Sequence, residues 1–252
     1  MKTTGNTTTA LLTALIYTLT IGAGMYVMHD IYGASYGEPE MMYVLWAVEI
    51  ILTLIAVYAV SRFGGWAQLG FGPLQWRQMV WLLPAIVILL LMWRTFFVHL
   101  GNVTLSPDQW RLLALSGFTT ALVGFSEEVI YRGIVLHVFL RHRSVWVAMG
   151  VSAIAFSLLH AVNVLGGVSL LGMSTQLALT GLVGFFLAPV ALKLKNLWPL
   201  ILWHWLWDFV LFAGNVSGAD IGSWSLLMIV NNLVLGGILW FLVGRAARKV
   251  SV

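Results

Sequence analysis

Long apolar runs are the feature of this sequence that most limits what the chain can fold into. A run of about 18 or more residues with few charges is long enough to cross a bilayer as a helix. Of the 252 residues, 60% are hydrophobic and 9% are charged. We identify such runs at residues 10–29, 41–60, 79–99, 112–140, 145–165, 175–192, 197–213 and 225–243. They predict an all-α polytopic membrane bundle with about eight transmembrane helices, and one membrane domain over residues 1–252.

Basic residues fall in alternate loops, which predicts how the spans are oriented. Positively charged residues concentrate in cytoplasmic loops. One set of loops and ends contains Lys2, Arg62, Arg77, Arg141, Arg143, Lys193, Lys195, Arg245, Arg248 and Lys249. The opposite loops, near 30–40, 100–110, 165–174 and 214–224, contain no Lys or Arg, and only Arg94 and Arg111 lie close to that side. We therefore expect both termini in the cytoplasm, and the plasma membrane as the location in a prokaryote.

The same distribution bears on binding partners. The formal net charge of +4 follows from the basic loops, so it calls for no nucleic-acid partner. Membrane lipid is the expected surrounding of the spans. The chain has no cysteine, which excludes disulfides and a catalytic thiol.

A few ionisable residues lie inside the predicted spans rather than in loops. They are Glu127, Glu128 and Arg132 in the fourth span, His160 in the fifth, His204 and Asp208 in the seventh, and Glu49 in the second. An ionisable side chain at membrane depth costs about 2.5–3.5 kcal/mol on insertion scales, so it usually faces a partner or a wet cavity. These residues therefore call for a functional or pairing role.

The spacing of these residues predicts some of their partners. Residues four apart share a helix face, so Glu128 can pair with Arg132, and His204 with Asp208. Glu127 points about 100° away from its neighbour and is left for another role. The sequence predicts no partner for Glu49, which lies in the second span.

The depth of each ionisable residue in the membrane can be estimated by counting residues from the nearest basic loop, since a helix rises about 1.5 Å per residue. Glu127, His160 and His204 then lie roughly 21, 26 and 14 Å from the nearest basic loop, in one overlapping layer. A carboxylate and two imidazoles in one layer are groups that can activate water and stabilise an oxyanion.

Three short motifs carry a family resemblance. "EEVIYR" (127–132) matches E-E-x-x-x-R, "FSLLH" (156–160) matches F-x-x-x-H, and "HWLWD" (204–208) matches H-x-x-x-N/D. In this order and on these spans they resemble the CPBP family, also called Abi, which contains CAAX prenyl proteases and bacteriocin-processing or immunity proteins. The resemblance covers about residues 112–213, and spans one to three carry no motif that we can match.

The resemblance implies an intramembrane endopeptidase with four catalytic residues. Glu127 would polarise the attacking water and His160 would work with it. His204 would donate to the oxyanion, and Asp208 would fix the tautomer of His204 or keep it protonated. Asp208 stands where the prenyl proteases have asparagine, and an ionised aspartate cannot itself donate to an oxyanion.

Three further residues are expected to support the catalytic set. Glu128 and Arg132 are expected to form a structural ion pair that holds the helix so that Glu127 faces the cavity. Asn163, one turn beyond His160, is placed to orient that histidine.

The metal requirement has two readings. Glu127, His160 and His204 are also a donor set for zinc, as two histidines and a glutamate. The two histidines do not share a helix at the H-E-x-x-H spacing of zinc proteases. We therefore expect no metal and no other cofactor, with zinc as the alternative.

The expected substrate is a hydrophobic or lipidated peptide, because a hydrophobic end is needed to enter a membrane cavity. Two other function classes stay open. A proton-coupled transporter also uses buried Glu, Asp and His, although it often shows repeated halves, and this chain has no detectable repeat. A non-catalytic immunity or scaffold protein would keep the fold with decayed motifs, and here all three motifs are complete.

Overall fold

The computed structural model describes residues 5–250, and the side chains up to residue 247. Its α-helices are α1 (Thr7–Tyr26), α2 (Met42–Arg62), α3 (Leu83–Leu100), α4 (Pro107–Glu128), α5 (Leu136–His142), α6 (Val145–Leu159), α7 (Leu170–Leu194), α8 (Trp198–Ser217) and α9 (Ser225–Val250). No strand occurs in the described residues, so the predicted all-α class is confirmed. That the chain is one domain stays a prediction.

Short helical turns of other kinds extend or join these helices. Two are π-helical, η1 (Val27–Ile31) and η5 (Val129–Val135). The others are 3-10 turns: η2 (Pro39–Met41), η3 (Trp66–Leu69), η4 (Trp76–Trp81), η6 (His160–Gly166) and η7 (Gly222–Trp224). Two of them, η5 and η6, contain or adjoin the predicted site residues.

Seven helical segments are long and apolar enough to cross a membrane, which confirms an integral membrane protein. They are Thr7–Ile31, Pro39–Arg62, Leu83–Leu100, Pro107–His142, Val145–Gly166, Leu170–Leu194 and Gly222–Ala247. The predicted span 197–213 is the exception. It forms α8, 20 residues long, but it is not among the seven by composition. Polar residues such as His204 and Asp208, together with several tryptophans, interrupt its apolar sequence.

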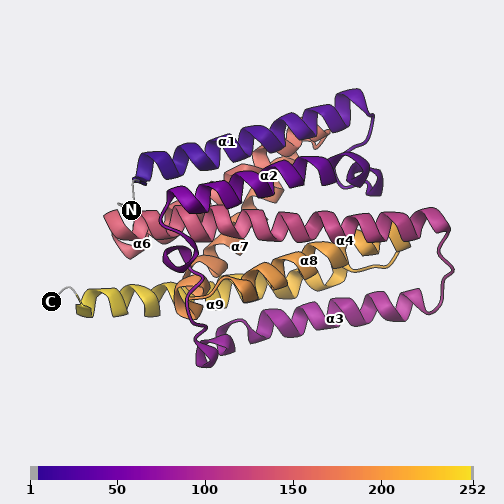
Figure 1. Ribbon diagram of the computed structural model, residues 1–252. Coiled ribbons are helices and arrows are strands. Elements are labelled where there is room, and N and C mark those ends of the chain that lie inside the picture. The colour runs from indigo at the N-terminus through magenta and orange to yellow at the C-terminus, as the bar shows by residue number, and fades with distance from the viewer. Residues whose placement is uncertain (1–4, 251–252) are drawn as a thin grey trace.

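The helices lie roughly along one direction in a single bundle (Figure 1). In that view α4 runs through the middle, with α1 and α2 on one side and α3 on the other. The first residues of α1 and the last residues of α9 lie at the same end of the bundle (Figure 1). Ends of the chain on the same side of the bundle are what an even number of membrane crossings would give. Which side faces the cytoplasm stays a prediction, and Lys2 lies outside the described residues.

Local sequence signals explain where α4 begins and how closely it packs. Ser106 caps the helix by accepting from the backbone N–H of Gln109, whose side chain accepts from the Ser106 N–H in return. Pro107 occupies the first turn, where its missing N–H costs nothing. Further along, a Cβ on Gly124 would lie 2.8 Å from the backbone nitrogen of Trp205. Only glycine therefore lets α4 approach α8 this closely, and these two helices bear the predicted site residues.

Candidate active site

The first motif lies where α4 changes from α-helical to π-helical. α4 ends at Glu128, the π-helix η5 begins at the next residue, and every residue from 126 to 136 is buried. A π-helix shifts the backbone hydrogen bonds from i→i+4 to i→i+5. Ser152 Oγ donates to the Tyr131 carbonyl at 2.8 Å, and His137 Nδ1 lies 2.7 Å from the Arg132 carbonyl. Side chains from α6 and α5 therefore hold this segment, and π-helical segments are frequent at functional sites.

Glu128 and Arg132 form the predicted pair. Arg132 Nη1 lies 3.0 Å from Glu128 Oε1, and both side chains are fully buried. Among the described residues no guanidinium N–H of Arg132 has hydrogen-bond geometry to an acceptor, so the contact is mainly one of charge. The guanidinium carbon also lies 3.9 Å from the centre of the Phe156 ring, a cation–π contact. The phenylalanine of the second motif thus covers the arginine of the first, a contact that the sequence did not predict.

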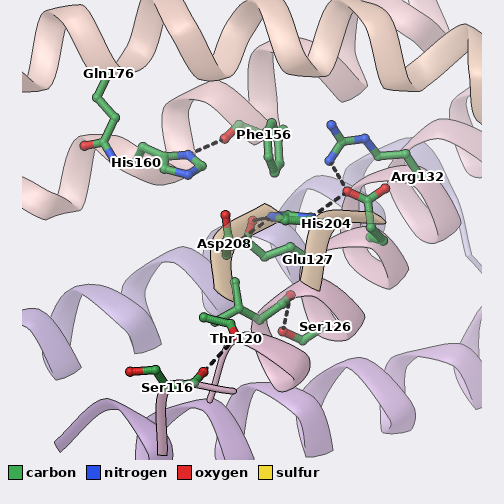
Figure 2. A network of polar contacts seen from close by, with 12 residues as sticks. Ser116, Thr120, Ser126, Glu127, Arg132, Phe156, His160, Gln176, His204 and Asp208 are labelled. Atoms are coloured by element: carbon green, nitrogen blue, oxygen red, sulfur yellow. Dashed lines mark hydrogen bonds and ion pairs between the residues drawn. The ribbon is translucent and has the colours of Figure 1, made fainter. Parts of the chain in front are cut away.

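His204 joins the first motif to the third, at the centre of the polar network in Figure 2. Its Nδ1 lies 3.0 Å from Glu128 Oε1, the same oxygen that faces Arg132. Its Nε2 lies 3.3 Å from Asp208 Oδ2 and 3.9 Å from Glu127 Oε2. The spacing predicted the Asp208 contact, but it gave no sign of the contact with Glu128, which comes from another helix. Glu128 therefore has two partners rather than one.

His160 is held by its own helix. Its Nδ1 lies 3.0 Å from the Phe156 carbonyl, four residues earlier, so Nδ1 carries the hydrogen and Nε2 keeps a free lone pair (Figure 2). The predicted orienting residue has a different partner. Asn163 donates to Gln176 at 3.0 Å, and Gln176 donates to Tyr36 at 2.9 Å. The hydrogen bond that orients His160 thus comes from the backbone of Phe156.

A cavity of about 630 Å³ brings the predicted catalytic residues together. Glu127, His160, His204 and Asp208 all line it, so the expected convergence of the three motifs is confirmed as geometry. Their catalytic roles stay predictions. Glu127 is 8% exposed, and its Oε2 has no hydrogen-bond partner in the described part of the chain. The carboxylate thus lines the cavity without a hydrogen bond from any described residue, although Oε2 itself is buried.

The cavity extends toward one end of the bundle only. Its lining includes Tyr36 and Gly37 from the 30–40 loop, and Asp220 and Gly222 from the 214–224 loop. None of its lining residues comes from the loops that carry the basic residues. The site thus reaches from the middle of the bundle to the end that we expect to lie outside the cytoplasm.

Glu49 of α2 also lines the cavity, and the sequence gave it no role. It is 3% exposed, and its Oε2 has no hydrogen-bond partner within the described residues. Its one sequence signal was its position deep in an apolar run, without any partner at helical spacing.

The zinc alternative can be tested on the donor atoms. Both ring nitrogens of His204 face carboxylates, so neither has a free lone pair directed at a metal. No group of three His, Asp or Glu side chains in the described residues has the arrangement of a metal site. The residues as arranged do not fit a zinc ion, and the metal-free reaction itself stays a prediction.

Comparison with known proteins identifies the motif-bearing segment. The family model described as "Type II CAAX prenyl endopeptidase Rce1-like" matches residues 108–210. The resemblance to the CAAX protease family is confirmed. No curated protein and no solved structure matches the chain. The match spans α4 to α8 and contains all three motifs, whereas Glu49 lies outside it.

The CAAX-protease-like segment supports an intramembrane endopeptidase as the coarse function. The matched residues are those that contribute Glu127, His160 and His204 to the cavity. Helices α1, α2 and α9 lie outside the match but also line the cavity, so part of the site is formed by regions that the family model does not describe.

Proposed function

We propose that this chain hydrolyses a peptide bond in a hydrophobic or lipidated peptide, with Glu127 as the base that activates the attacking water. One observation carries the proposal. Glu127 lines the cavity without a hydrogen bond to its carboxylate from any described residue, and His160 and His204 line the same space. A general base needs a carboxylate that is not already hydrogen-bonded to the protein, so that it can accept a proton from water.

In the first step, Glu127 takes a proton from water and the water oxygen attacks the carbonyl carbon of the substrate. His160 accepts a hydrogen bond from the second water hydrogen through its free Nε2, which orients the water. The electron pair of the carbonyl moves to its oxygen, and the tetrahedral intermediate forms.

In the second step, His204 donates its Nε2 hydrogen to the oxyanion instead of to Asp208, while Glu128 holds the imidazole through Nδ1. The C–N bond then breaks. Glu127 returns its proton to the departing amine nitrogen, and the carboxylate is ready for another water. No group outside this chain, the water and the substrate is needed for the balance.

The cavity walls support the proposed substrate class. Apolar side chains from four helices line it: Ile21 of α1, Leu45 of α2, Leu159 of α6 and Leu179 of α7. A soluble polar peptide would lose hydration there without compensation. A peptide with an apolar or lipidated end gains by burial, at about 0.8 kcal/mol per CH₂ group.

The test is peptide cleavage by purified protein in detergent, with thermal melting measured in parallel. Glu127→Gln keeps the shape but removes the base, so kcat/KM should fall about 100-fold or more with an unchanged melting temperature. Asp108→Asn is the matched control, since Asp108 is an exposed carboxylate far along α4 from the cavity. Full activity in Glu127→Gln would refute the mechanism.

Two further measurements distinguish the proposed function from the metal-dependent protease and from the proton-coupled transporter. A chelator should leave the rate unchanged, and a loss that zinc restores would establish the metal-dependent alternative. Proton flux into liposomes tests the transporter reading: flux that Glu127→Gln abolishes, without any cleavage in the wild type, would favour a proton-coupled transporter.

A further inference from the structure

The cavity is lined by acidic residues without any basic counterpart. Glu49, Glu127, Asp208 and Asp220 contribute carboxylates to its lining, and no Lys or Arg does. The lining also contains two histidines: His160 has its Nδ1 bonded to the Phe156 carbonyl, and both ring nitrogens of His204 already face carboxylates. The lining thus has four carboxyl groups and no lysine or arginine to pair with them.

Glu49 differs from the other three carboxylates. Glu127 and Asp208 contact His204, and Asp220 is exposed at the loop end of the cavity. Glu49 is 3% exposed, and its Oε2 lacks a hydrogen-bond partner within residues 5–247. A buried carboxylate without a partner is costly, so a binding partner supplied by a ligand would recover part of that cost.

We propose that Glu49 binds a basic side chain of the peptide substrate, so that the enzyme prefers apolar segments containing a lysine or an arginine. Such side chains have an apolar stem and a charged tip, which suits a cavity with apolar walls and one buried carboxylate. Trp203 and Trp207 stack at 5.4 Å and line the same cavity, which offers aromatic faces to a cation. The inference rests on the proposed peptidase function for its role in cleavage, but not for binding.

A metal ion would be a different occupant of this space. Divalent cations need several oxygen ligands that converge on one point. No three acidic or histidine side chains of the described residues converge in this way. A single ammonium or guanidinium group, which one carboxylate can bind, fits the arrangement better.

The binding test uses two acetylated apolar peptides that differ at one position, lysine in one and norleucine in the other. Norleucine keeps the apolar chain and lacks the ammonium group. Binding is measured by fluorescence anisotropy on the Glu127→Gln protein in nanodiscs, where no cleavage occurs. The lysine peptide should bind about tenfold or more tightly than its twin, which a charge-assisted hydrogen bond can supply.

Adding Glu49→Gln should bring the two affinities within about twofold of each other. Glu40→Gln is the matched control, because Glu40 is an exposed glutamate just before α2 and should leave the preference intact. A norleucine peptide with a free amino terminus distinguishes a side-chain site from an amino-terminal one. Equal affinities for the acetylated pair, or a preference that survives Glu49→Gln, would overturn the proposal.

Cleavage of the same peptides by otherwise unchanged protein separates this inference from the proposed function. A lysine preference in binding without cleavage of either peptide would reject the peptidase and keep the cation site. Cleavage of both peptides at equal kcat/KM, with equal binding, would keep the peptidase and reject the role of Glu49.

Discussion

Replacing Glu128 by glutamine tests the buried charge network most directly. Glu128 Oε1 lies 3.0 Å from Arg132 and 3.0 Å from His204, and the glutamate and the arginine are fully buried. Glutamine preserves the size of the side chain and removes its charge. Arg132 is then left at membrane depth without this carboxylate and with the Phe156 ring 3.9 Å from its guanidinium carbon.

The expected cost follows from this geometry. Breaking a buried pair on one side costs about 3–5 kcal/mol, because the remaining charge stays buried without compensation. In a chain of this length, 1 kcal/mol changes the melting temperature by roughly 2–4 °C. Glu128→Gln should therefore melt roughly 6–20 °C below the wild type. Its kcat should also fall, since His204 loses one of the two carboxylates that hold it.

The assay is thermal melting of purified protein in one detergent, with two control variants. The double variant Glu128→Gln with Arg132→Met removes the orphaned charge as well, so it should melt above the single variant. Asp108→Asn breaks an exposed ion pair of 3.8 Å and should change the melting temperature by less than about 2 °C. A Glu128→Gln protein that melts with the wild type would refute the argument that this pair stabilises the fold.

Three other predictions concern single positions, two for packing and hydrogen bonding and one for orientation. Gly124→Ala should lower the free energy of unfolding by about 1–3 kcal/mol, because the added Cβ would press on the α8 backbone. Gly237→Ala is the control, since nothing lies within 4 Å of its added Cβ, and it should be neutral or stabilising. Equal melting temperatures of the two variants would contradict this prediction. Ser152→Ala should lower the free energy of unfolding by about 0.5–1.5 kcal/mol, because it removes one of the two hydrogen bonds to the Tyr131 carbonyl, and an unchanged melting curve would argue against that bond. Because the chain has no cysteine, an impermeant maleimide added to intact cells should label Gly222→Cys and not Arg143→Cys; the reverse pattern would invert the predicted orientation.

The sequence predicted the helices well because crossing a bilayer imposes a length and a composition. All the predicted runs occur as helices, and α8 fails only the apolar criterion. That failure reflects the polar His204 and Asp208 and the several tryptophans that stand there in place of aliphatic residues. The Glu128–Arg132 and His204–Asp208 contacts were also predicted, because the four-residue spacing on one helix brings side chains together.

Contacts between helices could not be predicted in the same way. A helix that is apolar on all sides gives no sign of which face turns toward its neighbours. The contact between His204 and Glu128, 76 residues apart, depends on how α4 and α8 are rotated about their axes. The same reason explains why Glu49 had no predicted role: α2 is apolar around its circumference, and only the structure shows that this face lines the cavity.

The two adjacent glutamates illustrate how one helix can meet opposite demands. Glu128 faces Arg132 and His204 and does not line the cavity, so its charge is compensated within the protein. Glu127, one residue earlier and about 100° around the helix, lies 3.9 Å from His204 at its nearest contact and retains an oxygen without a partner. A strong ion pair at Glu127 would stabilise the fold but would occupy the lone pairs that a base needs. Separating the two roles on neighbouring residues predicts that variants of Glu128 mainly lower stability, while variants of Glu127 mainly lower the rate.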